Sequence, residues 1–506
     1  MEMYRRGIRW QKNPLRRFFR MPFVCCLLVS LPTTNLKAFS LLGPYVSWMD
    51  EAKSYRQYSD IGGPMNIGEG YRWNVPFVSY GFDKSFLEFF GSNGVTAVES
   101  AIEVLNSLPP ASQIALTNYS TSVFRLNFRA VAQNLIDLKS ETLFLLLQHM
   151  GLAEPQRFAF CLRDSIPANG DFVDTIIQRN FDPFTLQTSS NVNDVAFTDF
   201  VWHNAGRADA YELAVDPLMS GRYPAVADGS SGVGGFFVGL SRDDVGGLRY
   251  LLDTNNIKFE TLPAGVHGFG TNSNAIVDGA LRPGVDKITF VRHPFDSSPG
   301  QFVPMTNQFM DIYMSNGAAQ TQQLERIVTR PDFLFVAGDV RADKPVLPYY
   351  SRTGTSSWVN NAPLTGNAGG AGPGTIEPPV TITFNKLGAM FQASSPGADD
   401  AFSGGPVLWG TFDGTTNAPL VYPVAPVGTV SSTTRLWVVS GSITNQSSHS
   451  FEWTLSGPTN TPFIFQTSTD LISWKSLATN SNDGTVFTYF QWFPTSRVRF
   501  YRVVPE

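Results

Sequence analysis

Two adjacent carboxylates and one histidine–aspartate pair have the residue types and spacing that catalysis needs. Asp243 and Asp244 would suit general acid–base chemistry as a carboxylate pair. His203 follows Asp199 by four residues and lies beside Trp202, and an imidazole near a carboxylate readily exchanges protons. These four residues, Asp199, His203, Asp243 and Asp244, are the candidate catalytic residues. They act together only if the fold brings them into one cleft.

The position of the two adjacent aspartates in a predicted helix already accounts for them. Ser241 precedes a helical pattern that runs to about Leu252, and serine is a preferred N-cap. Carboxylates in a first helical turn are stabilised by the positive end of the helix dipole. The sequence therefore favours a capping role for Asp243 and Asp244 over acid–base chemistry.

Motifs for metals, cofactors and activated nucleophiles do not appear in the sequence. No two of the five histidines are four residues apart, as a zinc-protease helix requires. Asn191, Asn193, Asp194 and Asp199 resemble an oxygen-rich cation loop but lack the glycine and distal glutamate of a calcium hand. Residues 229–232 are one residue short of a Gly-x-Ser-x-Gly elbow, and no phosphate-binding loop occurs. We expect no bound metal and no cofactor.

The first forty residues have the pattern of an export signal. An apolar run, Met21–Leu31, is followed by small residues near Ala38 and Ser40, where cleavage is expected. The apolar run has about ten residues, and a membrane-spanning helix needs roughly 20. We interpret residues 1–40 as a removable signal, of Sec or twin-arginine type. The expected location is secreted, periplasmic or cell surface, with no transmembrane span after removal. The basic residues before the run are Arg5, Arg6, Arg9, Lys12, Arg16, Arg17 and Arg20.

Composition and charge exclude several classes of partner and site. The net charge is −5, and no basic stripe follows the leader, so nucleic acid is not an expected partner. Loss of Cys25 and Cys26 with the leader would leave only Cys161, which excludes an intrachain disulfide and a cysteine-based metal site. Charged residues make up 16%, and Gly, Pro, Ser, Thr and Asn are abundant, which favours strands joined by turns.

Hydrophobic periodicity predicts an α+β main domain over residues 41–357, with room for two subdomains. Helices are expected at Ser92–Leu108, Lys139–Met150 and from Ser241 to Leu252. Gly151 is the predicted C-cap of the second helix. Thr121–Ala130 alternates between polar and apolar residues and is predicted to be a half-buried strand.

A Gly- and Pro-rich segment, residues 358–379, is predicted to be a linker. Beyond it, residues 380–506 contain short β-type segments at the spacing of an all-β sandwich. The expected architecture is thus a strand-rich α+β region with a few helices, followed by a C-terminal sandwich.

Two family resemblances add to this interpretation. The segment Pro462–Pro505 has a Ser-Thr-Asp-Leu turn at Ser468–Leu471, Trp474 and a closing strand at Arg499–Val503. It resembles a short β-module at the C-terminus of exported proteins from verrucomicrobial-type bacteria, and the whole chain looks like uncharacterised exported proteins of such bacteria. The resemblance implies an appended surface module without chemistry of its own.

A second segment is similar to the matrixin-like metalloproteases. Gly151-Leu152-Ala153-Glu154-Pro155 matches the end of their zinc helix, and the helix after Ser241 matches a late helix of that family. The zinc-ligand positions hold Phe144, Gln148 and Glu154, and Leu145 replaces the catalytic glutamate. Phenylalanine cannot bind zinc. The resemblance therefore implies a peptidase scaffold without the zinc motif.

These observations favour an exported, non-catalytic binding or structural surface protein. Its expected partners are extracellular macromolecules or further copies of itself. The alternative is a secreted hydrolase whose site is not visible as a motif, or the degenerate peptidase scaffold. A hydrolase requires convergent ionisable groups in a concave pocket. A binding protein is expected to have an exposed aromatic or apolar patch.

Overall fold

The computed structural model describes the chain in segments. The described part is a strand-rich α+β structure, in agreement with the predicted class. Most of the predicted export signal, residues 1–37, lies outside it. The described segments are residues 38–56, 60–204, 207–219, 223–229, 231–270, 276–296, 300–338, 352–354, 357–365, 372–386, 407–423, 437–445, 450–456, 461–468, 474–482, 487–490 and 500–505.

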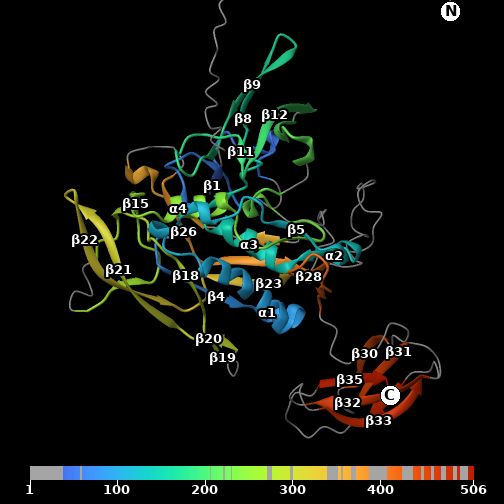
Figure 1. Ribbon diagram of the computed structural model, residues 1–506. Coiled ribbons are helices and arrows are strands. Elements are labelled where there is room, and N and C mark those ends of the chain that lie inside the picture. Colours follow the sequence, from blue (N-terminus) through green and yellow to red (C-terminus); the bar gives the residue numbers. More distant parts are fainter. Residues whose placement is uncertain are drawn as a thin grey trace, which may run out of the picture. The chain divides into compact units, whose positions relative to one another are not determined.

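A mixed five-stranded sheet lies at the centre of the main body (Figure 1). Its order is β18-β4-β23-β27-β24; the first four strands are parallel, and β24 is antiparallel to β27. Alternate residues of β23 and β27 are buried, which is the pattern of strands packed on at least one face. The strands are β4 (Phe77–Phe82), β18 (Thr289–Arg292), β23 (Phe333–Gly338), β24 (Arg352–Gly354) and β27 (Val380–Asn385).

Helix α1 (Lys84–Asn106) packs on this sheet through an aromatic cluster. The ring of Phe86 lies 6.4 Å from that of Phe335, and Phe90 lies 6.1 Å from Phe384. The structure begins the helix before the predicted start at Ser92, because Asp83 caps it and these phenylalanines are buried. Gly91, at φ 60°, kinks the helix where the sequence pattern indicated a beginning.

Helices α3 (Leu138–His149) and α4 (Arg242–Leu252) confirm the other two helical predictions. All but one residue of α3 are buried, so the helix is enclosed on every side. Gly151 follows α3 at φ +100°, and a Cβ there would approach the Tyr71 carbonyl oxygen to 2.2 Å. Only glycine fits this turn, as the sequence predicted.

The strand predicted at Thr121–Ala130 is only partly formed. β5 (Phe124–Leu126) pairs with β14 (Gly235–Phe237), and α2 (Phe128–Ala132) follows at once. The side chain of Asn127 accepts a hydrogen bond from the Ala130 backbone N–H at 2.8 Å. This local cap ends the strand although the alternating pattern continues.

The first described residues belong to the folded body. Ala38 and Ser40 are 0% and 1% exposed. β1 (Phe39–Gly43) pairs with three strands and is thus fully integrated. A boundary at residue 40 would cut this strand. The partner strands are β2 (Gly63–Met65), β7 (Leu152–Ala153) and β10 (Asn180–Phe181).

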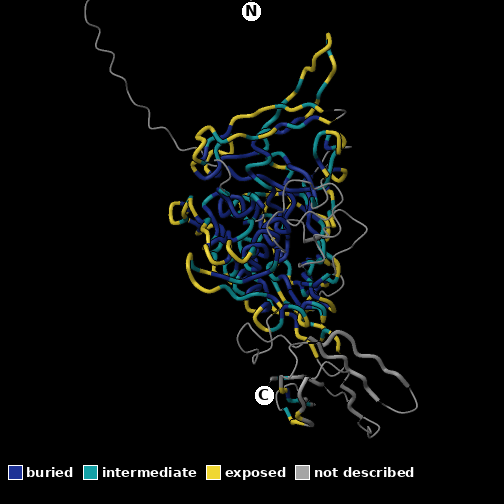
Figure 2. Tube along the Cα trace, turned by 90° about the vertical axis from the view of Figure 1, so that its right-hand side faces the viewer, coloured by how far each residue is buried: buried dark blue, intermediate teal, exposed yellow. Residues whose placement is uncertain are grey.

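Two hairpins project from the segment after α3, and β8–β9 is mostly exposed or intermediate along its length (Figure 2). The second hairpin, β12–β13, is extended by the short strand β11. A separate five-stranded sheet has the order β15-β17-β21-β22-β16. The strands are β8 (Cys161–Ala168), β9 (Asp171–Ile177), β11 (Asn191–Val192), β12 (Val195–Asn204), β13 (Arg207–Ala214), β15 (Lys258–Glu260), β16 (Val266–Gly268), β17 (Ala280–Arg282), β21 (Met305–Ser315) and β22 (Ala318–Val328).

The described residues of the predicted linker, 358–365 and 372–379, contain strands that pair with the main body. β25 (Ser357–Asn360) pairs with β26 (Gly374–Glu377), which pairs with β3 (Tyr71–Arg72) of the main body. β27, expected to begin the sandwich, lies inside the central sheet. The later strand β28 (Leu408–Thr411) pairs with β6 (Leu135–Asp137) and β29 (Leu420–Val421). Gly374 permits close packing here, because a Cβ at this position would lie 2.1 Å from the Tyr71 ring.

The C-terminal segments form two antiparallel three-stranded sheets, β30-β31-β34 and β33-β32-β35. Their packing as a sandwich remains a prediction. Most of the module turn at Ser468–Leu471, and Arg499, lie outside the described residues. The strands are β30 (Trp437–Asn445), β31 (Ser450–Ser456), β32 (Thr461–Ser468), β33 (Lys475–Asn482), β34 (Phe487–Phe490) and β35 (Phe500–Pro505); a further short hairpin joins β19 (Phe295–Asp296) to β20 (Gln301–Phe302).

Candidate functional site

The two adjacent aspartates are buried anchors of the fold. Asp244 accepts hydrogen bonds from the backbone N–H groups of Val226 (3.0 Å), Ala227 (3.0 Å) and Ser241 (2.9 Å). Asp243 accepts from the backbone N–H of Ala38 at 2.8 Å. Burial raises the pKa of both carboxyls. Their hydrogen bonds hold neighbouring loops against the start of α4, as the capping interpretation requires.

His203 contacts a different aspartate from the one that the sequence indicated. Its Nε2 lies 3.0 Å from Asp174 Oδ2, and the Phe172 ring stacks on the imidazole at 4.2 Å. Asp199 is exposed and is the cross-strand register partner of Glu212. His203 therefore lies between two hairpins, whereas Asp243 and Asp244 lie in the first turn of α4. Asp243 and Asp244 line one small pocket, and His203 lines a different one.

The positions that match the zinc helix of the matrixin-like proteases are placed in two environments. Phe144 and Leu145 are in the core, at 0% and 2% exposure, and Gln148 is also buried. Glu154 instead lines a cavity. Within the described residues, no group of three or more His, Cys, Asp or Glu side chains is arranged to hold a metal ion.

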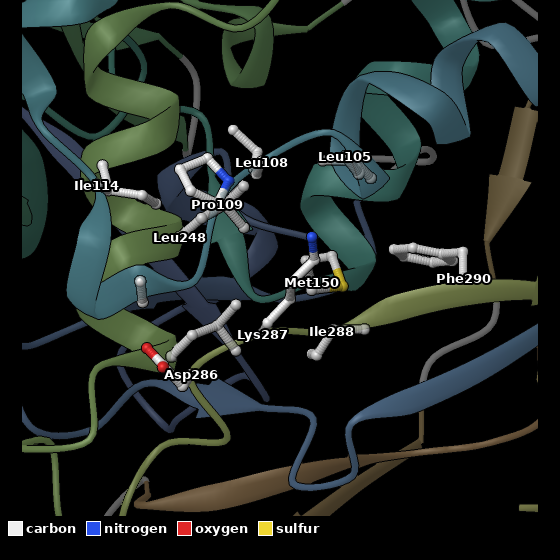
Figure 3. Close-up of a pocket in the computed structure, with 12 residues that line it drawn as sticks. Leu105, Leu108, Pro109, Ile114, Met150, Leu248, Asp286, Lys287, Ile288 and Phe290 are labelled. Atoms are coloured by element: carbon white, nitrogen blue, oxygen red, sulfur yellow. The ribbon is translucent and has the colours of Figure 1, made fainter.

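One apolar cavity lies between α1, α3 and α4 (Figure 3). Leu105, Met150 and Leu248 are among the side chains that line it. Its volume is about 30 Å³, which has room for one or two waters only. This cavity is a packing defect of the core and too small for a ligand.

A larger cavity, about 290 Å³, lies where η1 (Glu51–Lys53), the segment after α3 and strand β13 meet. We call it the acidic cavity. Its size is close to that of small-ligand sites. The side chains that give it its character are four carboxyls, Glu154, Asp209, Glu212 and Asp228, and five aromatic rings, Tyr55, Phe158, Phe160, Tyr211 and Tyr223.

Burial alters the acid–base properties of the carboxyls in the acidic cavity. It raises the pKa of Glu212 from 4.5 to about 7, with further increases from the nearby charges of Asp209 and Glu154. The pKa of Asp228 is also raised by burial. Arg157 offsets part of this charge, because its Nη1 lies 3.4 Å from Glu154 Oε2; the same guanidinium also lies 2.7 and 2.8 Å from the Asp60 carboxylate oxygens. A positive group that entered the cavity would lower the pKa of these carboxyls and favour their charged forms.

Large apolar side chains are exposed on one face of the neighbouring β12–β13 hairpin. Phe200 and Tyr211 are register partners and are 53% and 47% exposed; Trp202 and Leu213 are 38% and 51% exposed. The opposite face packs inward, with Ala208 and Ala210 in a small cluster with Leu162. We call the four exposed residues the apolar face. Tyr211 belongs to this face and also lines the acidic cavity.

The sequence pattern identified neither the acidic cavity nor the apolar face as a site. Strand β13 reads Arg-Ala-Asp-Ala-Tyr-Glu-Leu-Ala, with charged or large residues separated by alanines. That pattern does show small residues on the packed face. It does not show that Glu154 and Arg157, some fifty residues earlier, lie opposite Asp209 and Glu212.

Comparisons with protein-family models, curated proteins and solved structures found no match to this chain. Among the described helices, none is long and apolar enough to cross a membrane.

Proposed function

We propose that this chain is an exported, non-catalytic binding protein whose ligand is a polypeptide segment that carries both apolar and basic residues. The apolar side chains of the ligand contact the apolar face, and a lysine or arginine side chain enters the acidic cavity. The observation that carries this proposal is that Tyr211 belongs to both surfaces. One extended ligand can therefore contact both.

The apolar face supports a role in protein binding. Exposed aromatic and aliphatic side chains that adjoin one another mark interaction surfaces. The rings of Trp202 and Tyr211 are inclined at 73° with centroids 6.5 Å apart. An inclined pair of rings does not make a flat stacking platform, and the aliphatic Leu213 continues the surface. These features fit apolar side chains of a polypeptide.

The acidic cavity supports a basic group in the same ligand. Carboxylates together with aromatic ring faces attract ammonium and guanidinium groups through Coulomb and cation–π interactions. Self-association through this region is disfavoured, because two copies would bring like charges together. Residues 161–216 contain nine acidic residues and three arginines.

Synthetic peptides test the proposal directly. One set alternates leucine or phenylalanine with lysine, and a matched set has glutamine in place of lysine. The lysine set is expected to bind the full chain, and Trp202→Ser and Glu212→Gln are each expected to weaken binding about tenfold. Binding is measured by fluorescence anisotropy of labelled peptides.

Met310→Ser is the control, because Met310 is 52% exposed on β21, outside both surfaces. It is expected to leave binding unchanged. Equal binding of the glutamine set, or equal loss in Met310→Ser and Trp202→Ser, would show that the proposed surfaces are not the binding site.

The pKa of Glu212 favours a second candidate function, a secreted hydrolase. A carboxyl with a pKa of about 7 is able to serve as a general acid near neutral pH. Turnover of a panel of nitrophenyl glycosides and esters that is lost in Glu212→Gln but retained in Asp199→Asn would support hydrolysis over binding alone.

We also propose that the two C-terminal sheets pack as a sandwich and form an appended surface module. Their antiparallel pairing and short strands support this arrangement. Side-chain nuclear Overhauser contacts between residues of the two sheets would test it.

A further inference from the structure

A second cavity adjoins the acidic one and has the opposite character. Its volume is about 410 Å³, and we call it the basic cavity. Three side chains with basic nitrogens line it, and no carboxyl does among the described residues. The lining consists of Ala52, Lys53, Ser165, Phe172, His203, Asn204, Arg207 and Ala208.

Two of the three basic side chains that line the basic cavity contact a carboxylate. Lys53 Nζ lies 2.5 Å from Asp50 Oδ2, and His203 is paired with Asp174. Arg207 forms no ion pair with any described residue and is exposed. A carboxylate on a ligand would therefore find in Arg207 a guanidinium without an ion-pair partner among the described residues. A guanidinium binds a carboxylate through two parallel hydrogen bonds.

The remaining polar groups of the basic cavity are positioned to hydrogen-bond an oxyanion. Ser165 Oγ is buried and has no hydrogen-bond partner among the described residues. A hydroxyl in that condition gains by donating to a ligand. The ring of His203 is fixed in place by Asp174 and by the stacked Phe172. The amide of Asn204 adds a further donor.

The two cavities adjoin each other. Lys53 lines both, and the successive β13 residues Ala208 and Asp209 line the basic and the acidic cavity respectively. The two cavities are therefore close enough for a single polypeptide to place one side chain in each.

We propose that the basic cavity is a carboxylate-binding site, and that the polypeptide ligand carries an acidic residue close to the basic residue that enters the acidic cavity. This inference rests on the proposed function and narrows its ligand to a polypeptide with a pair of opposite charges. Arg207 and Ser165 are the residues that select the carboxylate.

The experiment extends the lysine peptides with a glutamate at one to four positions from the lysine, and with glutamine in matched peptides. At the best spacing, the glutamate peptide is expected to bind at least tenfold more tightly than its glutamine match. This difference should disappear in Arg207→Gln and fall in Ser165→Ala. Arg163→Gln is the control, because Arg163 is exposed on the adjacent hairpin and lines neither cavity.

Acetate, sulfate and inorganic phosphate, each at matched ionic strength, identify the anion. Acetate binding detected by saturation-transfer NMR and lost in Arg207→Gln supports the carboxylate assignment even if no lysine peptide binds, in which case the proposed function alone fails. Lysine peptides that bind without any gain from glutamate overturn this inference and leave the proposed function intact. Phosphate or sulfate competing more strongly than acetate overturns the choice of a carboxylate.

Discussion

Glu212 is the side chain at which the surroundings change the chemistry most clearly. It belongs to an ordinary exposed hairpin by sequence, yet it lies beside Asp209, Glu154 and Arg157 in the acidic cavity. Burial penalises its charged form, and the two neighbouring carboxyls add to the penalty, while Arg157 opposes it. The charge of the cavity at neutral pH is therefore set by the protonation of this residue.

The raised pKa of Glu212 has a consequence for stability. The folded chain retains a proton between pH 4.5 and about 7 that the unfolded chain has lost, so the free energy of unfolding falls as pH rises through this window. Glu212→Gln removes this dependence. We expect the variant to gain stability relative to the natural chain from pH 4.5 to 7, with no relative gain below pH 4.5.

Urea denaturation at a series of pH values measures this difference. Asp199→Asn is the matched control, because Asp199 is the exposed register partner of Glu212. A constant difference between Glu212→Gln and the natural chain across the window would refute the buried, proton-retaining state of Glu212.

Residue-level features could be predicted from the sequence where their partners are local. Ser241 caps α4, and its backbone N–H donates to Asp244 three residues later. The capping box therefore lies within four consecutive residues. The pairing of His203 with Asp174 spans two hairpins and has no local signal. Proximity in the chain to Asp199 was therefore a poor guide to its partner.

At the scale of elements, helices were predicted better than sheets. The periodic apolar pattern of α3 and the glycine after it depend only on the segment itself. The order β18-β4-β23-β27-β24 includes pairings between strands that are more than two hundred residues apart, such as β4 and β18. A short β-type segment contains no signal that identifies its partner strand. The Gly- and Pro-rich segment has the composition of a linker because it lacks apolar runs, although Gly374 packs closely against the Tyr71 ring.

A buried ion pair joins two of these sheets and offers a test at this scale. Arg326 on β22 donates to both carboxylate oxygens of Asp332, at 3.0 and 2.5 Å, and Asp332 also accepts from the backbone N–H and hydroxyl of Ser79 on β4. Removal of one partner leaves a buried charge uncompensated. We expect Asp332→Ala to lower the free energy of unfolding by about 3 to 5 kcal/mol.

Glu99→Ala provides the comparison. The Arg292–Glu99 pair has a separation of 3.0 Å, but Arg292 is 57% exposed, and exposed pairs contribute about 0 to 1 kcal/mol. Chemical denaturation of both variants at one pH gives the ratio. Similar losses in the two variants would mean that burial does not determine the strength of the Arg326–Asp332 contact.

At the scale of the whole molecule, the strand pairing places the end of the main body well beyond the predicted linker. β27 pairs with β23 over six register positions, and β28 pairs with β6 beside the start of α3. Trp409 on β28 is 1% exposed and packs on Phe384 and Phe90. Residues as far along the chain as Tyr422 thus contribute to the same hydrophobic core as α1.

This placement predicts opposite outcomes for two truncations. A chain that ends at Ser357 loses β27 and β28, which exposes one edge of β23 and the buried faces of Phe86 and Phe90 to water. A chain that ends at Pro423 keeps both strands. We expect the longer chain to be soluble and to unfold cooperatively in thermal melts followed by near-ultraviolet circular dichroism, and the shorter one to aggregate or to lack fixed aromatic packing. Cooperative unfolding of the shorter chain would restore the linker boundary predicted from the sequence.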